Sequence, residues 1–392
     1  MKRIHPAGLL SLLAVVALPL TACGTESTDV SSGSDGDARI MSVTAGDDSC
    51  EVSKAEAPAG TLRFNVHNAG DKVNEFYLVG EDGLQIVAEV ENIGPGANSQ
   101  LVVNAPAGSY FTACKPGMVG TSIRADFEVT ASDEKVEISA DEKEQIALAQ
   151  KNYAAYVQDQ SAQLLEKTTE FVQLYKDGKD DEARALYPVA RTHWERIETV
   201  AESFGTLDPK MDAREADLQP GEKWTGWHRI EKDLWPQKAE DYTALTTAER
   251  ATYADDLLAN TTTLDGKIAA LSYPVDAIAR GSSGLLEEVA TGKVTGEEEI
   301  WSETDLWDFQ ANVDGAKVAF AGVKPLVEAK DPALASTLQQ RFDALQELLD
   351  AQRDGEGFRK YGELDKETVK ELADAVNALS EPLSRLAGVV VP

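Results

Sequence analysis

The residues best suited to hold a metal ion stand close together in the segment GWHRIEKDLW. His228 and Glu231 are three positions apart, and residues with this spacing share one side of a helix. Helical bundles build metal sites in this way, from inward-facing His and Glu side chains of several helices. An exposed salt-bridging pair has the same spacing, so the HxxE pattern alone is a weak signal. Three tryptophans next to the pair are expected to fix its helix against a bundle: Trp224, Trp227 and Trp235.

Carboxylates that could complete such a site lie upstream of His228. Glu195, Glu198 and Glu202 have the spacing of one helical stripe, and Asp212 follows in a short irregular stretch. Such a stripe is usually solvated, but apolar side chains flank this one. A hard divalent or trivalent cation prefers oxygen ligands, here with one imidazole. The sequence therefore predicts a metal site made of His228, Glu231, Asp212, Glu195 and Glu198.

The motifs of common enzymes are absent from the sequence. It contains no HExxH, no Gly-x-Ser-x-Gly, no phosphate-binding glycine loop and no dinucleotide fingerprint. A zinc-dependent peptidase built on HxxE needs a second His, and no His follows His228. His193 lies five residues before Glu198, off the helical face of that glutamate. We therefore expect no catalytic residues, and a zinc-dependent peptidase is the alternative.

The sequence divides into two segments with different patterns of apolar residues, and these segments must position the candidate ligands. Residues 40–132 contain short runs rich in Val, Phe, Tyr and Ile between turn-forming stretches, which predicts an antiparallel β-sandwich of six or seven strands. From residue 133 to residue 392 the apolar spacing becomes helical, which predicts an all-α bundle of seven or eight helices. The clearest periodic positions are Ile146, Ala149, Tyr153, Val157, Leu164, Phe171 and Leu174, and then Leu334, Leu338, Phe342, Leu345 and Leu349.

The β segment holds a second set of candidate ligands. Copper-binding sandwiches use His, Cys and Met, but the histidines of that layout are missing here, so blue-copper ligation is disfavoured. Its glutamates offer an oxygen-rich alternative: Glu51, Glu75, Glu89 and Glu91. Cys50 and Cys114 are either a disulfide, as an even pair usually is outside the cytoplasm, or a thiolate metal site.

The N-terminus indicates export and lipid anchoring. Residues 1–23 combine a basic start with a short apolar stretch and end in LTAC, the pattern of a bacterial lipobox, so Cys23 is the expected lipidation site. Residues 24–39 are rich in Gly, Ser, Thr and Asp, which is typical of a flexible tether. We therefore expect the protein to be anchored by lipid on the outer face of the cell membrane.

The charge of the chain excludes one class of partner. The formal net charge is −31 over 392 residues, and such a protein repels nucleic acid and anionic membrane surfaces. The same charge attracts cations. The composition, with 42% hydrophobic residues, still allows a sizeable core.

Nine stretches along the chain resemble the EfeO family, whose members are extracytoplasmic components of bacterial ferrous-iron uptake systems. In order they are DDSCEVS, VENIGPG, PAGSYFTAC, ALYPVARTHWERIETVAESFG, DAREAD, GWHRIEKDLW, GLLEEVATGKVTGEE, SETDLWDFQANVDGA and GFRKYGEL. The resemblance implies a cupredoxin-like β-sandwich followed by an imelysin-like helical domain. It covers nearly all of the expected mature chain. The lipobox at Cys23 departs from many members and implies anchoring.

The resemblance also implies a function and its ligands. It implies iron binding by His228 and Glu231, with Glu195, Glu198 and Asp212 completing or flanking the site. It implies capture of iron for a membrane iron permease, together with a haem-dependent peroxidase-like partner protein. A second metal in the β domain, copper or ferric iron, would lie near Cys50, Glu75, Glu89, Glu91 and Cys114. Carboxylate and imidazole ligands accept ferrous or ferric iron, and zinc besides, so the sequence leaves the oxidation state open.

Overall fold

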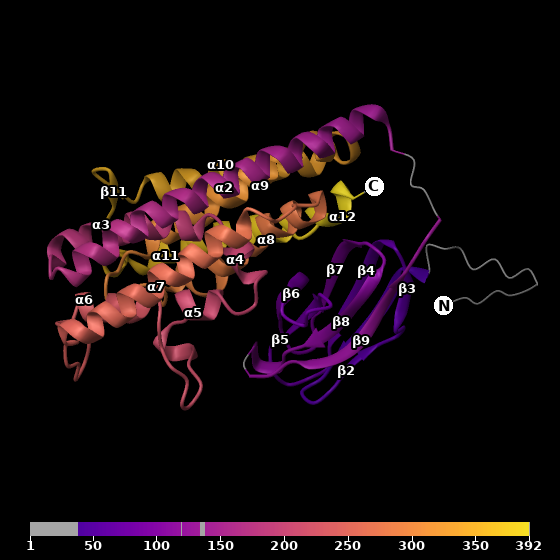
Figure 1. The fold of residues 1–392 in the computed structure, drawn as a ribbon. Coiled ribbons are helices and arrows are strands. Elements are labelled where there is room, and N and C mark those ends of the chain that lie inside the picture. The colour runs from indigo at the N-terminus through magenta and orange to yellow at the C-terminus, as the bar shows by residue number, and fades with distance from the viewer. Residues whose placement is uncertain (1–37, 119, 134–137, 392) are drawn as a thin grey trace, which may run out of the picture. The chain divides into compact units, whose positions relative to one another are not determined.

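The computed structural model describes residues 38–118, 120–133 and 138–391 (Figure 1). The predicted signal with Cys23, and all but the last two residues of the tether, lie outside these residues. Within them, an N-terminal domain of two β-sheets is followed by a largely helical domain. None of the helices in these ranges combines the length and apolar character that a membrane span requires.

The β domain has nine strands among the described residues, where the sequence predicted six or seven. They are β1 Ile40–Ala45, β2 Cys50–Val52, β3 Glu56–Pro58, β4 Gly60–Asn68, β5 Asn74–Val79, β6 Ile86–Ile93, β7 Asn98–Ala105, β8 Gly108–Cys114 and β9 Ile123–Thr130. One sheet has the order β2-β1-β4-β7 and the other β3-β9-β8-β5-β6. The expectation of purely antiparallel pairing was wrong, because β1 pairs with β4 and β3 with β9 in parallel. Strands of three residues show no readable alternation, and parallel pairing depends on contacts distant in sequence.

The two sheets bury their facing sides against each other. On β4, Leu62, Phe64 and Val66 alternate with more exposed neighbours, as a half-buried strand requires. The ring of Phe64 lies 5.2 Å from that of Phe76 on β5 and 5.5 Å from that of Phe127 on β9, so the aromatic core joins the two sheets.

The helical domain has eight α-helices of eight or more residues in its described part, within the predicted range of seven or eight. They are α2 Ala140–Lys176, α3 Asp180–Glu195, α6 Trp227–Leu234, α7 Thr247–Ile268, α8 Val275–Thr291, α9 Asp305–Lys330, α10 Pro332–Asp350 and α11 Lys366–Leu383. Three five-residue helices add to them: α4 Glu198–Glu202, α5 Asp208–Asp212 and α12 Leu386–Val390. A hairpin of β10 Arg353–Asp354 and β11 Gly357–Phe358 precedes α11.

The predicted helical periodicity is confirmed on α2 and α10. Tyr153, Val157, Leu164 and Phe171 are buried along α2, and all five predicted positions of α10 are buried. The long helices α2, α3, α8 and α9 pack against one another in one core. The short helices α4, α5 and α6, and the irregular segment between α8 and α9, carry most of the charged residues described next.

Candidate metal centre

A break between α3 and α4 separates two predicted ligands. The sequence predicted Glu195, Glu198 and Glu202 on one helical stripe, but α3 ends at Glu195 and α4 begins at Glu198. Ile197 between them leaves the helical conformation, with φ −131° and ψ 14°, and its side chain is fully buried. The helical pattern is therefore interrupted at a buried residue, and the stripe prediction was wrong in this respect.

Asp212 and His228 meet because α5 and the start of α6 approach closely. Gly226 precedes α6 with φ 90°, in the region that favours glycine. A Cβ atom at this position would lie 2.1 Å from the carbonyl oxygen of Met211. The chain between the two helices, residues 213–226, is largely exposed, so a long surface segment begins next to Asp212 and ends next to His228.

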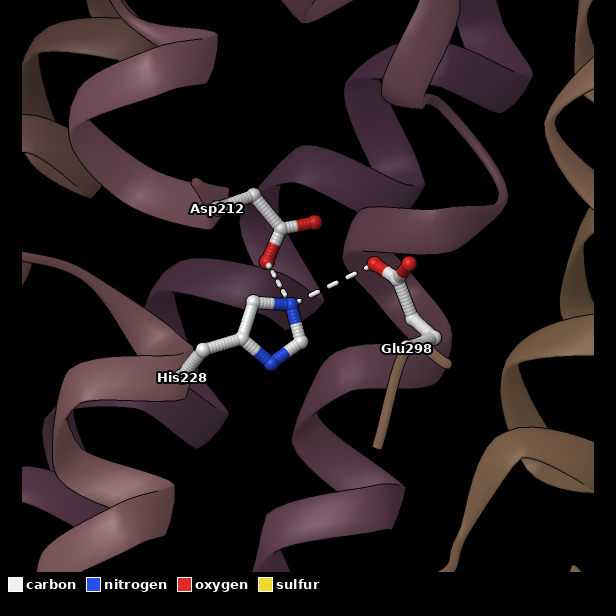
Figure 2. A group of neighbouring side chains, drawn as sticks. All are labelled: Asp212, His228 and Glu298. Carbon is white, nitrogen blue, oxygen red and sulfur yellow. Dashed lines mark hydrogen bonds and ion pairs between the residues drawn. The ribbon is translucent and has the colours of Figure 1, made fainter. Parts of the chain in front are cut away.

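The Nε2 atom of His228 faces two carboxylates from different segments (Figure 2). It lies 3.4 Å from Oδ1 of Asp212 and 3.3 Å from Oε1 of Glu298. All three side chains are buried, with exposed fractions of 1% for His228, 7% for Asp212 and 8% for Glu298. These ligand atoms are close enough together to share one cation.

The opposite nitrogen of the same ring is held by Glu231. Nδ1 of His228 lies 3.2 Å from Oε2 of Glu231, while Oε1 of Glu231 accepts the backbone N–H groups of Trp301 and Ser302 at 3.0 and 2.6 Å. Both oxygens of Glu231 therefore have partners within the protein. A carboxylate on the second nitrogen of a metal-binding histidine fixes the tautomer and the ring orientation.

Glu195 and Glu198 are held by a buried lysine. Nζ of Lys293 lies 3.0 Å from Oε2 of Glu195 and 3.0 Å from Oε2 of Glu198. Nδ2 of Asn312 on α9 donates to the same two oxygens, each at 3.2 Å. The two glutamates lie near Asp212, but the structure joins them to this lysine and not to His228.

Arg191 links the carboxylates of the centre. Its guanidinium is fully buried and forms salt bridges with Glu195, Asp212 and Glu299. Nη2 also lies 3.6 Å from Oε1 of Glu298. A buried carboxylate cluster needs such a partner, because isolated charges are strongly disfavoured in the protein interior.

Several residues of the centre were missing from the sequence prediction. Those with buried side chains are Arg191, Lys293, Glu298, Glu299, Asp305 and Asp308. Among them, Lys293 and Glu298 stand in GLLEEVATGKVTGEE, and Asp305 and Asp308 in SETDLWDFQANVDGA, which are two of the stretches that resemble the EfeO family. Glu298 stands in an irregular segment between α8 and α9, where no periodicity tells a buried glutamate from its exposed neighbour Glu297.

The buried charges shift the pKa values of the centre in opposite directions. Burial and Arg191 lower the pKa of His228, but the carboxylates of Asp212, Glu231 and Glu298 outweigh them and hold it well above its ordinary value. Burial raises the pKa of Glu298, yet Lys293, His228 and Arg191 together hold it below its usual range. The metal-free centre therefore pairs an imidazolium with an ionised Glu298.

Burial dominates at the remaining glutamates of the centre. It raises the pKa of Glu195 and of Glu198 to about 8, and that of Glu231 to about 7 with help from the nearby Glu299. These carboxylates therefore hold protons more readily than in water. A cation that binds to these carboxylates therefore displaces their protons.

The tryptophans support α6 as expected. The Trp227 ring is fully buried and packs 5.2 Å from Phe171 on α2 and 5.9 Å from Tyr187 on α3. Trp235 contacts Tyr187 at 5.6 Å. Nε1 of Trp194 donates to Oδ2 of Asp212 at 2.6 Å. Aromatic packing thus fixes α6, and an indole N–H fixes one oxygen of Asp212.

The β-domain candidates are placed in two different sheets. Glu51 is exposed on β2, whereas Glu75 is buried on β5 of the other sheet. Burial raises the pKa of Glu75 to about 7 against the effect of Lys115. Glu89 and Glu91 lie on β6, which pairs with β5. The clusters of three or more possible ligands that the described residues form all lie in the helical domain, and a second metal at these glutamates stays a prediction.

Of the two alternatives for the cysteines, the structure has the disulfide. Cys50 on β2 is bonded to Cys114 on β8, which joins the two sheets. Disulfide sulfurs carry no thiolate charge, and metal binding by Cys requires the thiolate. The assignment of Cys50 and Cys114 as metal ligands is therefore corrected.

Comparison with known proteins agrees with this architecture. The Imelysin family matches residues 149–386, and the Cupredoxin-like domain family matches residues 12–123. The iron uptake system component EfeO of Yersinia pestis is 33% identical over 380 residues, which cover 96% of each chain. EfeO of Escherichia coli O1:K1 / APEC is 34% identical over 358 residues, 89% of this chain and 91% of the relative. An Efem/EfeO family lipoprotein of Staphylococcus haemolyticus is 44% identical over 244 residues, 62% of this chain and 83% of the relative.

The fold and the buried centre define a class: proteins with a cupredoxin-like domain followed by an imelysin domain whose core holds a histidine among carboxylates. The long matches narrow this class further, because two of them cover nearly the whole of both chains. The chain belongs to the EfeO family.

Proposed function

We propose that this protein is the extracytoplasmic iron-binding component of an iron uptake system, which captures iron and passes it to a membrane permease. The observation that carries the proposal is the convergence of Asp212 and Glu298 on Nε2 of His228 inside the helical domain. Three separate chain segments supply these atoms, and Glu298 lies 70 residues beyond His228. The EfeO relatives are named as iron uptake system components.

The donor set suits iron as cargo. Two carboxylates and one imidazole offer hard and intermediate ligands, which ferrous and ferric ions both accept. Asp212, His228 and Glu298 are the proposed ligands, and Glu231 is a positioning residue that acts through Nδ1 of His228. Arg191 neutralises part of the carboxylate charge, so that the centre can fold before iron arrives.

The proposed location is the outer face of the cell membrane, with Cys23 as the lipidated residue. The Staphylococcus haemolyticus relative is named as a lipoprotein, which supports this placement. The proposed partners are a membrane iron permease and a haem-dependent peroxidase-like protein of the same system. If Cys23→Ala pellets with membranes to the same extent as the wild type, the anchoring proposal is wrong.

A zinc-dependent peptidase is disfavoured by the histidines of the described residues. His228 is the single histidine at the centre, because Nδ1 of His193 pairs with Gln160 and His67 lies on β4 of the β domain with Asn98 as its partner. Incubation of the zinc-loaded protein with a broad peptide library tests this. Sustained cleavage that disappears in Glu231→Gln would overturn the transport proposal.

Anaerobic titration of ferrous iron into the purified protein tests the proposal itself. We expect one tight site in the wild type and its loss in His228→Ala and in Glu298→Gln. Glu297→Gln is the matched control, because this exposed glutamate precedes Glu298 directly and its variant should bind as the wild type does. Equal affinity in the wild type and His228→Ala would place the iron site elsewhere.

A further inference from the structure

Lys293 is a buried cation that the proposed iron site does not use. It begins the short 3-10 turn Lys293–Thr295 between α8 and α9, and its side chain is 1% exposed. Lysine is almost never fully buried without a charged partner. Its partners here are Glu195 and Glu198, each with one oxygen 3.0 Å from Nζ.

The carboxylates around Lys293 form a second group with the spacing of a cation site. One oxygen each from Glu195, Glu198 and Asp212 lie within 4.8 Å of one another. Asp212 also belongs to the group with His228 and Glu298. A carboxylate with two oxygens can bridge two ions, and paired metal ions in proteins lie about 3.5–4 Å apart. Two of the three groups with this spacing thus share Asp212, and the third consists of His228, Glu231 and Glu299.

A further buried carboxylate near these positions accepts no hydrogen bond from the described residues. Asp308 on α9 is fully buried, and neither of its oxygens accepts a hydrogen bond among the described residues. Its Oδ1 lies 3.6 Å from Nε of Arg191, the residue that also binds Glu195 and Asp212. The cluster therefore holds more oxygen ligands than one ion and two basic side chains require.

We propose that Lys293 is a built-in cation that fills the position among Glu195, Glu198 and Asp212, next to the iron site, and so limits the centre to one iron. The inference rests on the proposed function, since it assumes that iron binds at His228. The ammonium group supplies one positive charge that is covalently attached to the chain, whereas a second metal ion would supply two or three.

The deciding measurement is the number of ions bound per chain. Lys293→Met removes the charge and keeps a side chain of similar length, and we expect it to bind two ferrous ions anaerobically where the wild type binds one. Loaded with Mn²⁺, the variant should show the electron paramagnetic resonance spectrum of a coupled pair, and the wild type that of an isolated ion. Lys370→Met, at a lysine side chain that is 73% exposed, is the control and should keep one ion.

Two further variants test whether a second ion binds because the charge of Lys293 is gone or because the substitution disrupts the structure of the centre. Lys293→Arg keeps the charge and should bind one ion. Lys293→Met combined with Glu198→Gln removes one carboxylate with the cation, and it should return to one ion. If Lys293→Met is unfolded without metal, refolding in Mn²⁺ should rescue it with two ions bound, because the metal replaces the lost ammonium.

The outcomes distinguish this inference from the proposed function. A wild type that binds no iron contradicts the proposed function. A wild type and a Lys293→Met variant that both bind one ion leave the iron site intact and overturn the role of Lys293. Failure of Lys293→Met to fold even with Mn²⁺ also overturns it, because the position would then accept no metal.

Discussion

Glu231 binds the imidazole of His228 on the side away from Asp212 and Glu298. Its Oε2 lies 3.2 Å from Nδ1, and the two carboxylates lie 3.4 and 3.3 Å from Nε2. The HxxE spacing thus places Glu231 beside Nδ1 of His228, where Glu299 also lies, and away from the Nε2 side that Asp212 and Glu298 face. The glutamate that faces Nε2 of His228 is Glu298, 70 residues further along the chain.

Glu231→Gln should weaken iron binding without abolishing it. Both oxygens of Glu231 accept hydrogen bonds, one from the backbone N–H groups of Trp301 and Ser302 and the other from His228. A glutamine has only one such oxygen, so its NH₂ group would face either the backbone N–H groups or the imidazole. We expect a loss of affinity of about 10- to 100-fold, typical of residues that orient a metal ligand, with one ion still bound. The measurement is an anaerobic titration beside Glu297→Gln. A loss as complete as in His228→Ala would make Glu231 a ligand, as the sequence predicted.

Iron affinity should fall as the solution is acidified. The pKa of His228 is raised in the metal-free protein, and Nε2 must be unprotonated to bind iron. Below that pKa each ion displaces a proton, so the dissociation constant should rise about tenfold per pH unit lost. Direct titrations between pH 6 and pH 8 measure this slope. A dissociation constant that is independent of pH would exclude His228 as a ligand.

The increase in Tm that iron binding produces should become larger as the pH rises. In the metal-free protein the raised pKa of His228 contributes stability that is fully present below about pH 6.5, its unfolded value, and is lost as the pH rises through the folded pKa. The iron-bound protein gains stability as its affinity increases. The difference in Tm between the two forms should therefore grow from pH 6 to pH 8, and this growth should disappear in His228→Ala.

Gly226→Ala should lower both the stability and the iron affinity of the protein, although Gly226 is not itself a proposed ligand. The new Cβ would collide with the carbonyl oxygen of Met211 and would also strain a backbone at φ 90°. We expect a loss of about 1–3 kcal/mol in the free energy of unfolding, and weaker iron binding because α5 and α6 move apart. Gly221→Ala is a matched control, since Gly221 has φ 91° but no atom within 4 Å of its Cβ position. That variant should show the backbone strain and retain its iron affinity.

Removal of the disulfide should destabilise the β domain. Cys50 and Cys114 are 64 positions apart, and closure of a loop of that length restricts the unfolded chain by about 4 kcal/mol. The double variant Cys50→Ser and Cys114→Ser should unfold at correspondingly lower denaturant concentration. Thiol titration of the unfolded wild type, purified in air, checks the bond, and two free thiols would contradict it.

Much of the fold could be predicted from the sequence, because the patterns that indicate helices and strands are formed by residues close together in the chain. The helical spacing from Tyr153 to Phe171 follows from burial of one helix face and is confirmed, and the short runs rich in Val, Phe, Tyr and Ile correctly indicated the β domain. Short strands and the parallel pair β1–β4 depend on contacts between distant segments, which no local pattern encodes.

The metal centre was predicted only in part, because some of its residues lie in a segment without a regular pattern. His228 and Asp212 were recognisable by residue type and motif, and the structure brings them together. Lys293 and Glu298 stand in a family motif, but both lie in the irregular segment before α9, where neither the helical nor the strand period distinguishes a buried side chain from an exposed one. Only the assembled core shows that one of these residues neutralises Glu195 and that the other faces His228.

The close approach of Asp212 to His228 has a mechanical consequence for the chain between them. An ion bound to both residues cross-links the two ends of residues 213–226 and closes a ring of chain, as a disulfide would. Most of that ring lies on the surface, so loading with iron restricts a segment that other proteins can touch. A partner that binds this segment would therefore meet a stiffer loop on the loaded protein than on the empty one.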